Sequence, residues 1–383
     1  MFVVVAEIDA AYFSPAGHAK IEVLSLVFAR RTNQMKTGLS LSELASEIER
    51  QANTKRDFIA PARELAMEAE PTGLAVRVNG HGSFGVNETA HAQFAERLSI
   101  PKTYYDRMLT QAPELLTSNV NHWLQAQPDR KMVRTLDGNI RAFLSDRYRP
   151  LDNFDLAECV LPAILQNNCR VESSALTERR LYIKAVTERL QADIKVGDTV
   201  QAGIVISNSE IGLGSIKVEP MIYRLVCSNG MISADHSMRK YHVGRNAGEG
   251  SLAEEFFKDA TRRADDKAFW MKVRDVVEGS FREDVFNRLV DGMRDATQKQ
   301  ITGDPVKVVE VAQKHFGFTD SERGGILTHL IKGGDLSQYG LLNAVTRASQ
   351  DVPDYDRATE LERAGGQVIE LSSKDWKAIA EAA

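Results

Sequence analysis

Two hydrophobic periodicities alternate along the chain and predict where its strands and helices lie. Apolar residues occupy every second position in Val200, Ala202, Ile204 and Ile206. This alternation is typical of an antiparallel strand with one buried face and one wetter face. Asp137-Gly138 between two short apolar runs predicts a two-residue hairpin, and residues 75–86 predict another around a glycine-rich turn.

Helical spacing dominates elsewhere in the chain. Leu41, Leu44 and Ile48 recur at this spacing behind serines that can cap a helix. The same kind of pattern predicts helices over 56–70, in two or three segments from 88 to about 125, and after a cap at Asp152 or Asn153. Beyond residue 250, charged helical patterns replace the alternating ones up to about residue 349.

Together these patterns predict an α+β fold, with an antiparallel sheet flanked by helices and followed by a mainly helical C-terminal region. We expect the α+β body over 35–250, the helical region over 251–350 and a partly ordered C-terminal tail over 351–383. Residues 1–34 are expected to be a translated, non-native leader, because Arg30-Arg31 can be encoded as a ribosome-binding sequence shortly before Met35. A genuine N-terminal strand or flexible arm is the alternative.

Composition places the chain among ordinary globular proteins. Hydrophobic residues make up 43% and charged residues 26%, which argues against extensive disorder. The net charge of −5 means that a nucleic acid would have to meet a local basic surface. The three cysteines form no CxxC pair, so we expect a reducing, cytoplasmic location, and no apolar stretch predicts a membrane span.

Signatures of enzymes and cofactor sites are weak. The stretch "GHGSFG" at 80–85 matches GxGxxG, but the following helix is predicted only from Glu88, and no acidic residue follows at the expected distance. His236 and His242 lack a third ligand at recognisable spacing. We therefore predict neither a cofactor nor a metal site.

The stretch "SNSEIGLGSIKVEPMIYRLVCSNGMI" at 207–232 places an arginine inside an apolar run. It predicts a loop with bends at Gly212 and Gly214, followed by a strand that carries Arg224. If that face is buried, Arg224 needs a carboxylate, for which Glu219 and Glu210 are candidates. If that face is solvent-exposed, Arg224 can bind a phosphate with two parallel hydrogen bonds. We favour the buried, paired arginine.

Basic residues interleaved with aromatic ones form three clusters on predicted sheet elements. They are Arg141, Arg147, Tyr148 and Arg149; Arg179, Arg180, Tyr182 and Lys184; and Arg239, Lys240, Tyr241 and Arg245. Such clusters supply phosphate contacts and stacking faces for single-stranded nucleic acid. Solvated hairpin ends would account for each cluster alone. The nucleic-acid interpretation requires the exposed members to share one connected surface.

Four motifs resemble a known family. They are "NETAHAQFAERLSIPKTYYDRML", "SDRYRPLDNFDL", the stretch at 207–232 and "YGLLNAVTRASQD". In this order they are similar to the phage/plasmid-like proteins with domain of unknown function 932, over about Leu39 to Leu371. The resemblance implies a protein of phages, plasmids or integrated elements, and it implies no reaction.

Two functions of different class follow from these observations. The first is a mobile-element accessory protein that binds single-stranded DNA in replication, recombination or strand annealing through the basic clusters. The second is an enzyme of unknown reaction with a polar site on the same sheet, formed by Asn208, Glu210, Arg224 and Asn229. A homo-oligomer is left open in both cases.

Overall fold

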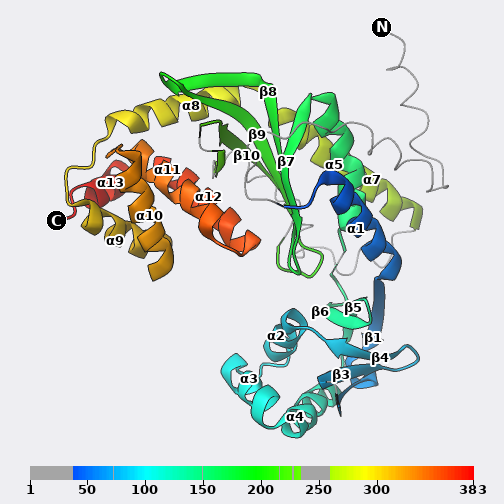
Figure 1. Ribbon diagram of the computed structural model, residues 1–383. Coiled ribbons are helices and arrows are strands. Elements are labelled where there is room, and N and C mark those ends of the chain that lie inside the picture. The colour runs from blue at the N-terminus through cyan, green and yellow to red at the C-terminus, as the bar shows by residue number, and fades with distance from the viewer. Residues whose placement is uncertain (1–37, 72, 149, 215, 227, 234–258) are drawn as a thin grey trace, which may run out of the picture.

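The computed structural model describes residues 38–71, 73–148, 150–214, 216–226, 228–233 and 259–383. It confirms a mixed α+β fold with a mainly helical C-terminal region, and it contains two sheets where we expected one. The first sheet lies with helices α2, α3 and α4 at one end of the molecule (Figure 1). The second sheet lies between two groups of helices (Figure 1). The expected leader at 1–34 and the expected boundary at residue 250 fall outside the described residues.

The first sheet has six strands in the order β1-β5-β6-β4-β3-β2. Its strands are β1 (Arg56–Pro61), β2 (Leu65–Glu70), β3 (Gly73–Val78), β4 (Gly82–Val86), β5 (Arg130–Leu136) and β6 (Asn139–Ser145). All neighbours pair antiparallel except β4 and β6, which run parallel over a short overlap. The covering helices are α2 (Glu88–Arg97), α3 (Lys102–Gln111) and α4 (Pro113–Ala126), and they bury one apolar cluster against the sheet.

The predicted hairpin at Asp137-Gly138 is confirmed. Asp137 and Gly138 have φ values of 50° and 79°, as the central residues of a tight hairpin turn require. The turn joins β5 to β6 in antiparallel register. The hairpin predicted over 75–86 is also confirmed, as β3 and β4.

The prediction of a helix over 56–70 is wrong. The segment forms β1, a short 3-10 turn (Ala62–Glu64) and β2. Pro61 cannot donate a helical hydrogen bond, and Leu65 and Met67 alternate toward the core. Asn121 of α4 bonds both backbone groups of Met67. Tertiary pairing here overrides the helix propensity of alanine, glutamate and methionine.

The second sheet has five antiparallel strands in the order β11-β10-β9-β8-β7. Its strands are β7 (Cys169–Leu176), β8 (Leu181–Lys195), β9 (Asp198–Asn208), β10 (Lys217–Arg224) and β11 (Asn229–Ile232). Helices α1 (Leu41–Thr54), α5 (Asn153–Gln166) and α7 (Asp259–Gly279) pack on one face (Figure 1). Ser40 caps α1 with its side chain as predicted, and Asp152 occupies the N-cap position of α5 without a capping side-chain hydrogen bond.

The C-terminal helices form the other large cluster with this sheet. They are α8 (Glu283–Gln298), α9 (Pro305–Phe316), α10 (Asp320–Gly333) and α11 (Gln338–Ala348), and a 3-10 turn (Ser349–Asp351) follows them. Their apolar side chains pack with Val200, Ala202 and Ile222 of the sheet. The predicted helical region therefore lies against the α+β body.

The tail expected over 351–383 instead forms packed helices α12 (Tyr355–Ile369) and α13 (Ser373–Ala380). A Cβ atom at Gly366 would lie 2.0 Å from the carbonyl oxygen of Ile232, so glycine permits α12 to approach β11. The start of α12 also packs on Val205. Both faces of β9 are consequently buried, and the expectation of a wetter face was wrong.

A buried histidine leads to a prediction about pH. His91 Nδ1 lies 2.8 Å from the Tyr105 hydroxyl, and burial, with a smaller effect of Lys102, lowers the pKa of His91 to about 4. An unfolded histidine has a pKa of about 6.5, so the unfolded state binds more protons between these values and stability falls with falling pH. From pH 7 to pH 5 we expect the wild type to lose about 2 kcal/mol more unfolding free energy than His91→Gln. Urea unfolding of both proteins at the two pH values measures this, and equal losses would contradict it.

Candidate ligand-binding cleft

The loop between β9 and β10 crosses from the second sheet to the first. Ile211 packs against Met132 and Leu144 of the first sheet, and Gln93 donates a 2.7 Å hydrogen bond to the Ile211 carbonyl. Gly212 has a φ of 78°, and a Cβ there would lie 2.7 Å from Leu144 Cδ2. The bend predicted at Gly212 thus lets the loop dock and places Glu210 at the junction of the two sheets.

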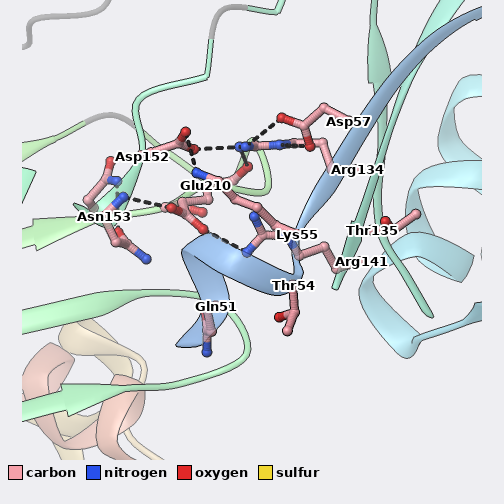
Figure 2. Close-up of polar contacts among 12 residues, drawn as sticks. Gln51, Thr54, Lys55, Asp57, Arg134, Thr135, Arg141, Asp152, Asn153 and Glu210 are labelled. Atoms are coloured by element: carbon pink, nitrogen blue, oxygen red, sulfur yellow. Dashed lines mark hydrogen bonds and ion pairs between the residues drawn. The ribbon is translucent and has the colours of Figure 1, made fainter. Parts of the chain in front are cut away.

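Arg134 on β5 is the centre of the ionic contacts at this junction (Figure 2). Its side chain is completely buried. Its Nε and Nη2 each donate 2.9 Å bonds to Asp57, and Nη2 also donates to Asp152 at 2.8 Å. Its Nη1 donates to the Glu210 carbonyl oxygen at 2.6 Å. Arg134 therefore joins strand β1, the segment before α5 and the β9–β10 loop.

The electrostatics of Asp152 follow from these contacts. Burial on its own would raise its pKa, but Arg134 and Lys55 outweigh this and hold the pKa below its usual value. The Lys55 ammonium lies 2.5 Å from Asp152 Oδ2. Asp152 is therefore a permanent anion at neutral pH, and it serves to balance the two cations.

Arg141 and Glu210 form a second buried pair beside the first. Arg141 Nη1 lies 2.6 Å from Glu210 Oε2, and the other carboxylate oxygen of Glu210 accepts from the Asn153 backbone N–H at 2.6 Å. The Asn208 side chain donates to Asn153 Oδ1 and to the Leu151 carbonyl. The pair thus ties β6 to the first turn of α5 (Figure 2).

A cleft of about 360 Å³ opens beside this pair, between the two sheets. Its lining comes from α1, the β5–β6 hairpin, the N-termini of α2 and α5, the β7–β8 turn and the β9–β10 loop. The lining residues are Arg50, Gln51, Asn87, Leu136, Asp137, Asn139, Arg141, Asn153, Leu176, Thr177, Glu178, Arg179, Arg180, Glu210 and Ile211. Among the residues that the structure describes, no group of three or more His, Cys, Asp and Glu side chains is arranged to hold a metal ion.

A model of the family with domain of unknown function (DUF932) matches residues 142–365. This match covers more than half of the chain. The chain belongs to the DUF932 family. The matched region supplies Arg179, Arg180 and Glu210 to the cleft, whereas Arg50 and Arg141 precede it. The resemblance seen in the sequence is thereby confirmed at the family level.

Comparisons with curated proteins and with solved structures gave no match. In the described part of the chain, no helix combines the length and the apolar character needed to cross a bilayer.

The structure brings part of the predicted basic residues together. Arg141, Arg179 and Arg180 line the cleft. On the β9–β10 loop, Tyr148 donates to the Ser209 carbonyl oxygen and Arg180 donates to the Leu213 carbonyl oxygen. The first and second basic clusters therefore meet at this loop. Arg147 and Arg179 are exposed, and Tyr148 is half-buried.

Other members of the basic clusters do not lie on this surface. Lys184 and Tyr182 are buried under α12, where Lys184 pairs with Glu362, so neither is available to a nucleic acid in this structure. The expectation for Lys184 was wrong because the helix that covers it was expected to be a tail. Arg149, Arg239, Lys240 and Arg245, together with Tyr241, lie outside the described residues.

The alternative polar site does not form as one site. Asn208 and Glu210 lie together near Asn153 at one end of the second sheet. Arg224 pairs in register with Val200, eight residues from Asn208 along β9, which is roughly 25 Å of strand. Asn229 lies beside Arg224 and donates to the Thr346 hydroxyl of α11 at 2.6 Å. The four residues therefore split between the two ends of the sheet.

Arg224 is a largely buried, paired arginine, as we favoured, but its partner differs from both candidates. Its Nε and Nη2 bond the two carboxylate oxygens of Asp198 at 2.6 and 2.7 Å. Glu219 instead pairs with Arg363 of α12. The partner was missed because Asp198 lies 26 positions away in the sequence and becomes adjacent only through the β9–β10 register.

Sequence reasoning also missed Arg134, Asp57 and Lys55. Arg134 follows two apolar residues in a short strand, as Arg224 follows an apolar run, and that placement was the available signal for a buried arginine. Asp57 was hidden by the wrong helix prediction for 56–70, and Lys55 lies just before that segment, at the end of α1. The ionic contacts between the two sheets could not be predicted, because all these strands were predicted to lie in a single sheet.

Proposed function

We propose that this DUF932 protein is a mobile-element accessory protein that binds single-stranded DNA in replication, recombination or strand annealing. The proposal places the strand at the cleft between the two sheets. The observation that supports it is that Arg141 from β6 and Arg179 and Arg180 from the β7–β8 turn line one cleft. Guanidinium groups at such a site would bind the phosphates of the strand.

Apolar residues of the same cleft complement these cations. Leu136 and Leu176 are half-buried in its lining, and Ile211 is buried beside them. Such surfaces suit the sugars and base faces of a strand without selecting its sequence. The net charge of −5 requires the attraction to come from this local concentration of arginines.

Charge reversal at the β7–β8 turn tests the proposal. We expect Arg179→Glu with Arg180→Glu to weaken binding of a fluorescent single-stranded oligonucleotide by at least about tenfold at low salt. Each lost phosphate contact should also make the dependence of log affinity on log salt shallower by about 0.7. Fluorescence anisotropy over a series of salt concentrations measures both quantities.

The matched control is Arg107→Glu with Arg288→Glu, which makes the same charge change at exposed positions on α3 and α8. Its affinity should stay within about threefold of the wild type, because screening weakens distant charges. Circular dichroism establishes that both double variants are folded. Equal affinities of the two double variants, or no oligonucleotide binding by the wild type, would exclude the proposed function.

A further inference from the structure

Arg141 carries two buried donors that have no partner among the described residues. Its Nη1 is bonded to Glu210, but Nε and Nη2 are unpaired within the part of the chain that the structure describes. The side chain is 9% exposed. A buried donor of a charged group without a partner costs about 1–3 kcal/mol or more, so this arrangement calls for an acceptor.

Other arginines of the chain indicate what kind of acceptor suits these two nitrogens. Arg134, Arg224 and Arg363 each use Nε and Nη2 to bond both oxygens of one carboxylate, at distances between 2.6 and 3.0 Å for the closest pairs. This edge of the guanidinium group matches two oxygens of a carboxylate or a phosphate. In Arg141 the same edge meets no acceptor from the described residues, while Nη1 is bonded to Glu210.

The surroundings of Arg141 favour an anion. Asn87 is the N-cap of α2 and Asn153 is the first residue of α5, so the positive ends of two helices adjoin the cleft. Two of the three carboxylates in the lining are already paired, Glu210 with Arg141 and Asp137 with Arg50. Glu178, the third, is exposed.

We propose that the Nε and Nη2 edge of Arg141 is a binding position for a terminal phosphate, with Arg179 and Arg180 contacting the same group from the β7–β8 turn. A phosphate monoester has a single link to the rest of its ligand, so it can reach a buried guanidinium with its free oxygens first. The strand continues on both sides of an internal phosphodiester. Such a group fits less well in a cleft of about 360 Å³ whose guanidinium lies buried at the bottom. The ligand is therefore a nucleotide or the phosphorylated end of a strand, and the strand end as its source rests on the proposed function.

Calorimetric titration of the full chain at constant ionic strength tests the site directly. The probes are inorganic phosphate, thymidine 5′-monophosphate and thymidine, with chloride as the balancing anion. We expect saturable binding of the two phosphate-bearing probes and none of thymidine. Absence of saturable binding by the wild type would overturn the inference, whatever the variants do.

Arg141→Lys is the decisive variant. Lysine can still pair with Glu210 but cannot offer two parallel donors, so the affinity for phosphate should fall by at least about tenfold. Arg170→Lys is the matched control, since Arg170 also pairs with carboxylates but does not line the cleft. Should Arg141→Lys fail to fold, Arg141→Gln with Glu210→Gln removes both buried charges together and carries the same expectation. Unchanged phosphate affinity in the folded variant would overturn the inference.

Oligonucleotides with a phosphate or a hydroxyl group at each end separate this inference from the proposed function. Tighter binding of one phosphorylated form, lost in the Arg141 variant, supports both. Saturable nucleotide binding without oligonucleotide binding sustains the inference and excludes the strand as ligand. Oligonucleotide binding that ignores terminal phosphates, together with no binding of inorganic phosphate, sustains the function and overturns the inference.

Discussion

Replacing Arg134 by methionine is expected to lower the free energy of unfolding by about 3–5 kcal/mol. The substitution keeps an apolar stem but leaves Asp57 and Asp152 without their shared cation, and it leaves the Glu210 carbonyl oxygen without its donor. Removing one partner of a buried ionic group is costly because the remaining charge stays desolvated. Urea unfolding at pH 7, followed by circular dichroism, measures the loss.

The control for Arg134→Met is Arg77→Met on β3 of the same sheet. Arg77 pairs with Glu68, and both side chains are exposed, so its loss should cost no more than about 1 kcal/mol. The low pKa of Asp152 adds a second readout. The ionised Asp152 carboxylate stabilises the folded state fully above the ordinary aspartate pKa of about 3.9, and this stabilisation is lost as the pH falls through the lower pKa of the folded state. The difference in unfolding free energy between wild type and Arg134→Met should therefore shrink in acid. Equal stabilities of Arg134→Met and wild type at pH 7 would refute the role assigned to Arg134.

Lys184→Met is expected to lower the free energy of unfolding by a similar amount, about 3–5 kcal/mol. Lys184 lies on the face of the second sheet that α12 covers. Lys184 Nζ lies 2.5 Å from Glu362 Oε2, and the two side chains are only 2% and 3% exposed. The variant leaves the Glu362 carboxylate of α12 buried without its cation. Adding Glu362→Leu should recover a large part of the loss, because apolar side chains of similar size replace buried ion pairs at little cost.

Lys195→Met is the matched control, since Lys195 lies on the same strand and pairs with Asp335 at a more exposed position. It should cost no more than about 1 kcal/mol. Unfolding free energies of the two single variants and of Lys184→Met with Glu362→Leu complete the comparison. A double variant no more stable than Lys184→Met, or Lys184→Met as stable as the wild type, would show that the pair does not hold α12 on the sheet as we expect.

Local signals in the sequence were reliable where neighbouring residues alone define the conformation. Asp137-Gly138 needs positive φ angles at both positions, and Gly212 with Gly214 marks a bent loop, so both features could be predicted from a few residues. Leu44 and Ile48 are buried on α1 as their spacing predicts. The DUF932 relationship was likewise visible in ordered motifs of the sequence.

The pairing of charges could not be predicted, because it depends on how distant segments pack. Arg134 and Asp57 are 77 positions apart, and Lys184 and Glu362 are 178 apart, and nothing in the local sequence of either partner specifies the other. The same holds for the cleft, to which Arg141 and Arg180 contribute from different sheets. The turns, most helices and the mixed α+β class could be predicted from the sequence, because these depend on short-range backbone preferences and periodic burial. Which arginines are buried and which line a cleft depends on how two sheets and α12 pack together, since burial and pairing arise from contacts between segments distant in the chain.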